Sequence, residues 1–103
     1  MSTIGFVTCK DVGEARSIAN ALLQKKLIAC ANIINGVESI YWWKGNIQNA
    51  TEALLILKTN PNKLDQLIPE IQKNHSYELP SIEFINVDHT TPLVQQWINQ
   101  SLK

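Results

Sequence analysis

The chain has 103 residues, 45% of which are hydrophobic, and its nine basic side chains balance nine acidic ones. This length and composition predict one globular domain over residues 1–103 rather than a disordered segment. The zero net charge argues against a nucleic-acid-binding protein, and no apolar run approaches the ~20 residues that a membrane helix requires.

The first quarter of the chain predicts a strand followed by a helix. Residues 3–8 form a short β-rich run, and residues 11–27 carry apolar side chains at helical spacing. Asp11 is suited to accept the first free backbone amides of this helix, and Glu14, three residues later, completes a start that resembles a capping box.

The middle of the chain is β-rich but allows two pairings. Asn35-Gly36 lies between two apolar runs and is a strong hairpin signal, which would pair the two halves of residues 28–43 with each other. In the alternative, residues 28–43 form one long bent strand with Gly36 as a bulge. The chain then turns through residues 44–50 and pairs back through residues 52–59.

The last part of the chain predicts a helix, a strand and a second helix. Residues 60–75 return to helical spacing, with a kink or break expected at Pro69. Residues 81–88 predict the last strand, and residues 93–102 predict a short C-terminal helix docked by Trp97.

This order of elements predicts an α+β protein with a ferredoxin-like βαββαβ sandwich, a long ribbon made by its second and third strands, and a C-terminal helix. Both main helices should cover one face of an antiparallel sheet. In the usual strand order the third strand separates the first from the second, so Cys9 and Cys30 would lie about 10 Å apart, too far for a disulfide. Two cysteines and no visible secretory signal lead us to expect a cytoplasmic protein with reduced thiols.

Trp42 and Trp43 are consecutive on a predicted strand, so their side chains must point to opposite sides. We expect one of them to join the core beneath the helices and the other to be covered by a second subunit. Aromatic residues are enriched at subunit contacts, so the pair predicts an oligomer and supplies two interface candidates.

Four stretches together resemble the CutA divalent-cation tolerance family, namely "GEARSIANALLQKKLIACANII", "GVESIYWWKGNI", "EALLILKT" and "HSYELPSI". The resemblance implies a ferredoxin-like subunit in a compact homotrimer, with long strands that extend between subunits. It therefore favours the long strand over residues 28–43. It also implies a role in tolerance to copper and other divalent cations. Two positions depart from the family pattern: Ser76 replaces a usual proline and Ser81 a usual glutamate, which weakens a metal or acid role for that loop.

Three residues are candidate metal ligands: Cys30, His75 and Glu78. Cys30 matches the cysteine of the family, and as a thiolate it would suit copper or another soft cation. The alternative is that Cys30 is a small buried hydrophobe. No ligand spacing such as C-x-x-C is present, so we expect weak binding of copper or another divalent cation and no required cofactor.

Lys58 and Tyr77 are candidates for a second kind of site, because the resemblance places them near a cleft between subunits. A lysine and a tyrosine in such a cleft could hold a small anion. The alternative function is therefore a trimeric sensor or scaffold that binds a small anion or a protein partner. We do not expect an enzyme, because the apolar surroundings of Cys30 predict an inert thiol even if His75 were its partner.

Overall fold

The computed structural model describes residues 1–103 and contains a four-stranded antiparallel sheet and three α-helices. The mixed α and β class is therefore confirmed. No helix is both long and apolar enough to cross a membrane. The elements in chain order are β1 (Ser2–Cys9), α1 (Val12–Gln24), β2 (Cys30–Trp43), β3 (Asn46–Thr59), a 3-10 turn (Pro61–Lys63), α2 (Leu64–Asn74), β4 (Ile82–Val87) and α3 (Pro92–Ser101).

The strands are ordered β2-β3-β1-β4, so the third strand lies between the first and the second, as expected. Cys9 pairs with Ala53, whereas Cys30 pairs with Lys58, five residues farther along β3. Since side chains alternate along a strand, the two cysteines also point to opposite faces of the sheet. A bridge between these two free thiols is geometrically impossible within the subunit.

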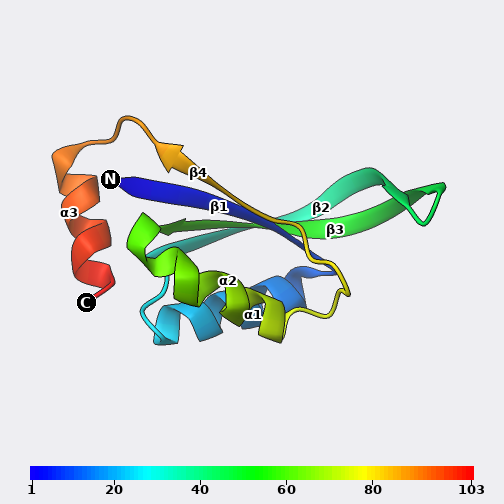
Figure 1. Ribbon diagram of the computed structural model, residues 1–103, viewed down its shortest axis with the longest axis horizontal. Helices are drawn as coiled ribbons and strands as arrows, with labels where there is room; N and C mark the ends of the chain where they lie inside the picture. The colour runs from blue at the N-terminus through cyan, green and yellow to red at the C-terminus, as the bar shows by residue number, and fades with distance from the viewer.

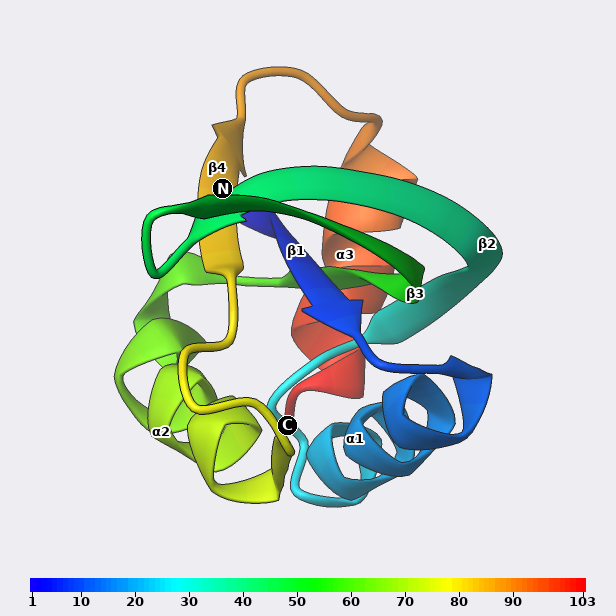
Figure 2. The ribbon, with the colours of Figure 1, turned by 90° about the vertical axis from the view of Figure 1, so that its right-hand side faces the viewer.

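Helices α1 and α2 lie side by side on one face of the sheet (Figures 1 and 2). Their apolar faces bury a core with the odd-numbered positions of β1 and β3, which comprises chiefly Val7, Ala15, Ile18, Leu22, Leu55, Leu57, Leu67 and Ile71. The opposite face carries no such cover. We call it the open face and define it by Ile4, Phe6, Thr8, Cys30, Leu54, Ile56 and Lys58, all of which retain partial exposure.

The start and the end of helix α1 are determined by residues close to them in the sequence. The Asp11 carboxylate accepts the Glu14 amide at 2.8 Å, which confirms the predicted cap. The Glu14 carboxylate accepts a hydrogen bond from the Lys10 amide at 3.0 Å. In a complete capping box it would accept from the amide of the cap residue, Asp11. The helix ends at Gln24, three residues before the predicted end, and Lys26 then adopts a left-handed conformation with φ 59°.

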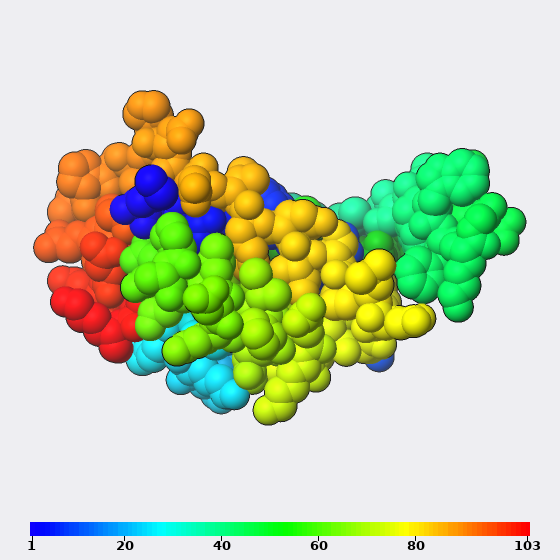
Figure 3. Space-filling view, in the orientation of Figure 1, coloured from blue at the N-terminus to red at the C-terminus, as the bar shows by residue number.

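The ribbon of β2 and β3 resolves the two pairings left open by the sequence. β2 runs unbroken through Asn35-Gly36, where the register shifts and Gly36 has φ 75°, so the bulged long strand is correct and the early hairpin is wrong. The reversal occurs at Lys44 and Gly45, with φ 50° and 82°, as in a two-residue type I′ turn. β3 therefore begins at Asn46, and the predicted turn over residues 44–50 was too long. The ribbon tip stands out from the body along the 45 Å long axis (Figure 3).

Two predictions for the last part of the chain need correction. Helix α2 is not broken at Pro69, although a kink there stays a prediction, and the irregular segment is the 3-10 turn that precedes the helix. Helix α3 is capped by the Thr91 hydroxyl and docked by the buried Ile98 and Leu102. Trp97 is 45% exposed, so it is not the anchor, because it lies one residue away from the buried face of the helix.

Candidate functional site

Three side chains of metal-ligating type meet where β1, α1 and the segment after α2 converge. One ligand atom from each of Cys9, Glu14 and His75 lies within 4.8 Å of the other two. His75 and Glu14 come from elements that the fold brings together, and Cys9 ends β1 on the helix-covered face. Only His75 was among the candidates predicted from the sequence.

His75 has both ring nitrogens engaged. Its side chain is 0% exposed. Nδ1 accepts the Tyr77 amide at 3.1 Å, so Nε2 carries the proton and donates to the Thr8 carbonyl at 2.8 Å. No lone pair is left for a metal, so the ring ties the segment after α2 to the end of β1.

Glu14 makes a second hydrogen-bonded connection, which joins the segment after α2 to the start of α1. Its Oε1 accepts the Lys10 amide and its Oε2 accepts the Ser76 amide, each at 3.0 Å. Burial acts to raise the pKa of this carboxyl, but the hydrogen bonds from Ser76 and Lys10 and the nearby His75 outweigh it, so the pKa lies below its ordinary 4.5. A proline at position 76 could not donate this bond, so Ser76 adds a contact that the usual family residue lacks.

Cys9 is fully buried, and its thiol is expected to be unreactive. Burial, followed by the nearby carboxylates of Glu14, Glu52 and Asp11, raises its pKa to about 12. A thiol that stays protonated is a poor nucleophile and a poor ligand. Because Cys9 is protonated and both ring nitrogens of His75 are already hydrogen-bonded, the cluster has a structural role: it connects β1, α1 and the segment after α2.

The predicted ligands Cys30, His75 and Glu78 are not brought together within one subunit. Cys30 begins β2 on the open face, partly exposed, with Sγ 3.8 Å from the Asn32 side-chain oxygen. His75 binds Thr8, whose partner on β3 lies four residues from the partner of Cys30, or about 13 Å along the strand. Glu78 is exposed in the loop after α2.

Lys58 and Tyr77 are also separated. The Tyr77 hydroxyl donates to Glu52 Oε2 at 2.6 Å, and burial together with this bond raises the pKa of Tyr77. Glu52 and Lys58 are six residues apart on β3, about 20 Å. Only a neighbouring subunit could bring a Lys58 close to this Tyr77.

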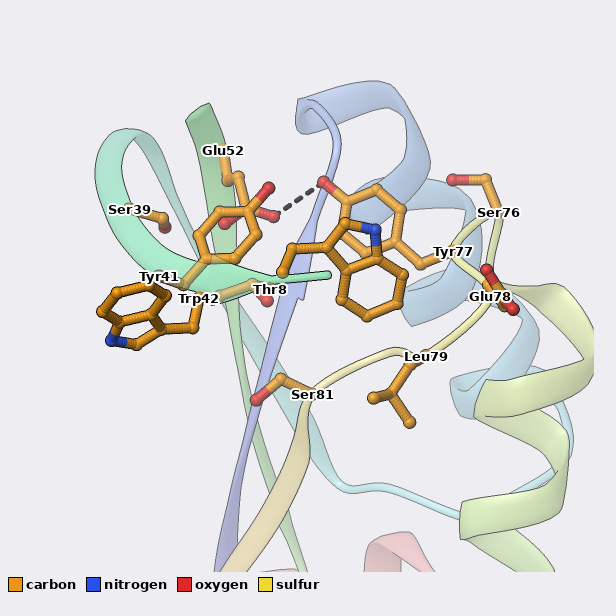
Figure 4. A pocket seen from close by; sticks show the side chains of 11 residues that line it. Thr8, Ser39, Tyr41, Trp42, Glu52, Ser76, Tyr77, Glu78, Leu79 and Ser81 are labelled. Atoms are coloured by element: carbon orange, nitrogen blue, oxygen red, sulfur yellow. Dashed lines mark hydrogen bonds between the residues drawn. The ribbon is translucent and has the colours of Figure 1, made fainter. Parts of the chain in front are cut away.

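A pocket of about 630 Å³ lies beside Tyr77. It lies between the ribbon, the end of β1 and the loop after α2, and Figure 4 shows Tyr41 entering from β2 and Tyr77 from the loop, with Glu52 on β3. Its walls are Thr8, Ser39, Tyr41, Trp42, Trp43, Glu52, Ser76, Tyr77, Glu78, Leu79 and Ser81. None of these residues is basic.

The two tryptophans contribute to this pocket instead of the core. Trp42 is 71% exposed, and Trp43, although partly buried, is absent from the cluster beneath the helices. The expectation that one of them joins the core was therefore wrong, because the ribbon carries both past the end of the helices. Sequence reasoning also missed Glu52. Its one local signal is a carboxylate at the start of the apolar run "EALLIL".

The comparisons with known proteins agree along nearly the whole chain. Residues 3–101 match the model of the family described as CutA1 divalent ion tolerance protein. The chain is 36% identical to the divalent-cation tolerance protein CutA of Archaeoglobus fulgidus, over 95% of each chain. It is 32% identical to the rice protein CutA 1, chloroplastic, over 99% of this chain, but it spans only 58% of that relative's length and 56% of the Arabidopsis one.

Solved structures give the same result. The structure of the periplasmic divalent cation tolerance protein CutA from Archaeoglobus fulgidus superposes with a TM-score of 0.96, at 35% identity and 100% coverage of both chains. That of the divalent ion tolerance protein CutA1 from Ehrlichia chaffeensis gives 0.94, at 34% identity, over 99% of this chain and 95% of that one. The chain therefore belongs to the CutA1 divalent ion tolerance protein family.

Proposed function

We propose that residues 1–103 form a single ferredoxin-like domain that assembles as a homotrimer and contributes to divalent-cation tolerance by binding copper weakly. The open face supports the assembly. Ile4, Phe6 and Ile56 lie there without a covering helix, and Trp42 stands exposed on the protruding ribbon. Removing such apolar surface from water contributes about 25 cal/mol of hydrophobic free energy per Å², which opposes the entropic cost of association.

The position of Cys30 carries the metal proposal. Its thiol points to the open face, the side of the sheet that a neighbouring subunit would cover, so ligands from two chains could meet there. A thiolate is a soft ligand suited to copper. Glu78 is free to add an oxygen ligand from another subunit. His75 could ligate only if the Tyr77 amide released Nδ1, so its share in binding is the smallest.

Copper titration of the reduced protein by calorimetry tests this proposal. Cys30→Ser should abolish the binding signal. Cys9→Ala is the matched control, because it removes the other thiol and should leave binding unchanged. Saturable binding that persists in Cys30→Ser, or no saturable binding at all, would refute the assignment of Cys30.

The oligomer is tested separately by light scattering at micromolar concentration. A homotrimer should give three times the mass of the 11.6 kDa chain. A monomer at this concentration would contradict the account of the open face. A cytoplasmic location stays a prediction, since relatives carry chloroplastic and periplasmic descriptions.

We assign no enzymatic activity. The protonated Cys9 and the saturated His75 offer neither a nucleophile nor a base, which supports this view. The alternative function is a trimeric sensor or scaffold that binds a small anion or a protein partner. The pocket beside Tyr77 does not support binding of an anion. An anion there would meet the carboxylates of Glu52 and Glu78 and no basic wall.

A further inference from the structure

Two charged side chains of β3 have no opposite charge beside them within the subunit. Glu52 is 7% exposed, and its hydrogen-bond donor there is the neutral hydroxyl of Tyr77. Lys58 is partly buried on the open face, and the two ion pairs of the chain involve other residues. A charge removed from water is costly unless it is paired, and an assembly that covers the open face would bury both groups further. Each of them therefore needs a partner from outside its own subunit.

The two side chains cannot satisfy each other within one chain. They lie six residues apart on β3, or about 20 Å, which is beyond the reach of a lysine. Because side chains alternate along a strand, an even separation places both on the same side of β3, which is the side of the open face. A second copy of the chain that covers this side can present its Lys58 to Glu52, and the two charges then neutralise each other.

The open face offers few alternatives to this pairing. Lys58 is the only basic residue among those that define the face. The other carboxylate on this side of the sheet is Glu83, which pairs in register with Phe6. Glu83 is exposed and accepts a hydrogen bond from the Ser81 hydroxyl at 2.6 Å, so water and Ser81 already satisfy it. An exposed ion pair contributes little, whereas leaving a buried carboxylate unpaired is costly. Charge complementarity therefore favours Glu52 as the partner of Lys58.

We propose that Glu52 forms an ion pair with Lys58 of the partner subunit, and that each subunit of the homotrimer repeats this contact with the next. The contact joins two different points of the open face, so it is head-to-tail and closes into a ring. The pocket beside Tyr77 gives the incoming lysine room in front of Glu52 (Figure 4). The inference rests on the proposed homotrimer and deepens its metal proposal. Cys30 is the register partner of Lys58, so the same contact brings Cys30 of the partner subunit toward Glu78, which lines that pocket.

Exchange of the two charges tests the proposal by thermal unfolding at fixed protein concentration and low ionic strength. Lys58→Glu and Glu52→Lys each bring like charges together, so each should lower the unfolding midpoint by about 5 °C or more. The double variant restores opposite charges and should recover at least about half of the summed loss. Glu83→Lys is the matched control, because it reverses a carboxylate on the same side of the sheet, and its effect should add to that of Lys58→Glu. Additive losses for Glu52 and Lys58, or recovery with Glu83→Lys instead, would overturn the proposal.

Neutral substitutions protect the test against misfolding of the charge-reversed variants. Glu52→Gln can still accept the Tyr77 hydrogen bond, and Lys58→Met keeps the length of the side chain, so the two together should cost less than the sum of their separate losses. Light scattering of the wild-type protein at micromolar concentration separates failure of the ion pair from failure of the homotrimer. A monomer would overturn both, whereas a trimer in which the charge exchange and the neutral pair are both additive would overturn the ion pair alone.

Discussion

The contact between Gly5 and Phe84 joins the two strands β1 and β4 and can be tested by adding one methyl group. The two residues are paired in the register, and a Cβ at position 5 would lie 2.3 Å from Cε1 and 2.7 Å from Cδ1 of the Phe84 ring. Such distances are far inside van der Waals contact, so Gly5→Ala must displace the ring. Gly5 has no positive φ, so alanine suits the backbone and the whole penalty is steric.

The expected magnitude is the difference between two opposing effects. Overpacking a core position costs about 1–3 kcal/mol. Alanine in a strand recovers about 0.5–1 kcal/mol of conformational entropy relative to glycine. The difference runs from about 0 to 2.5 kcal/mol, and its midpoint predicts a loss of about 1 kcal/mol in the free energy of unfolding for Gly5→Ala.

Urea denaturation at fixed protein concentration measures this loss, and a double-mutant cycle assigns it to the ring. In a Phe84→Leu background the same change should cost about 1 kcal/mol less, because the ring is gone. Gly13→Ala, in the first turn of α1 with its nearest new contact at 3.4 Å, is the control and should stabilise by about 0.4–1 kcal/mol. An equal cost of Gly5→Ala in both backgrounds, or a gain in stability, would refute the steric explanation.

Three further predictions concern Tyr77, Glu14 and the two cysteines. Tyr77→Phe removes the only donor to the buried Glu52 and should lower the unfolding free energy by about 1–3 kcal/mol in urea denaturation, and an unchanged midpoint would contradict this role. The lowered pKa of Glu14 means that its stabilisation is complete above pH 4.5 and is lost as the pH falls through the folded-state pKa. Acid titration should therefore destabilise the wild type more steeply than Glu14→Gln, and parallel curves would argue against this carboxylate as the cause. At pH 8, Cys9 should stay unmodified by a thiol reagent in the folded protein and react only after denaturation in urea, which mass spectrometry of labelled peptides checks, and labelling of Cys9 in the folded protein would contradict its burial.

Local signals predicted much of the backbone. Apolar spacing and the Asp11 cap located the start of α1, since both depend on residues within one or two helical turns. The long β2 strand was one of two readings, and the resemblance to a known family selected it. The turn after β2 was placed correctly but predicted too long, because a non-glycine residue at positive φ, such as Lys44, is uncommon and the polar residues after it resemble a loop.

The site depended on contacts that leave little trace in the sequence. His75 was predicted as a ligand, but its role is set by Thr8, 67 residues away, and no periodicity marks that hydrogen bond. The face on which Cys30 lies follows from strand register, which a single-residue shift would reverse. The hydrogen bond from Tyr77 to Glu52 joins residues 25 positions apart, so it could be recognised only in the folded chain.

The central position of β1 also has a consequence for the folding of the nascent chain. β1 is synthesised first, yet one neighbour, β3, is complete only at Thr59 and the other, β4, only at Val87. Nearly the whole chain must therefore leave the ribosome before both edges of β1 are paired. Such non-local pairing is slow and leaves an apolar strand edge exposed. Chains truncated before β4 should consequently aggregate during synthesis, while the helices, whose contacts are local, form early.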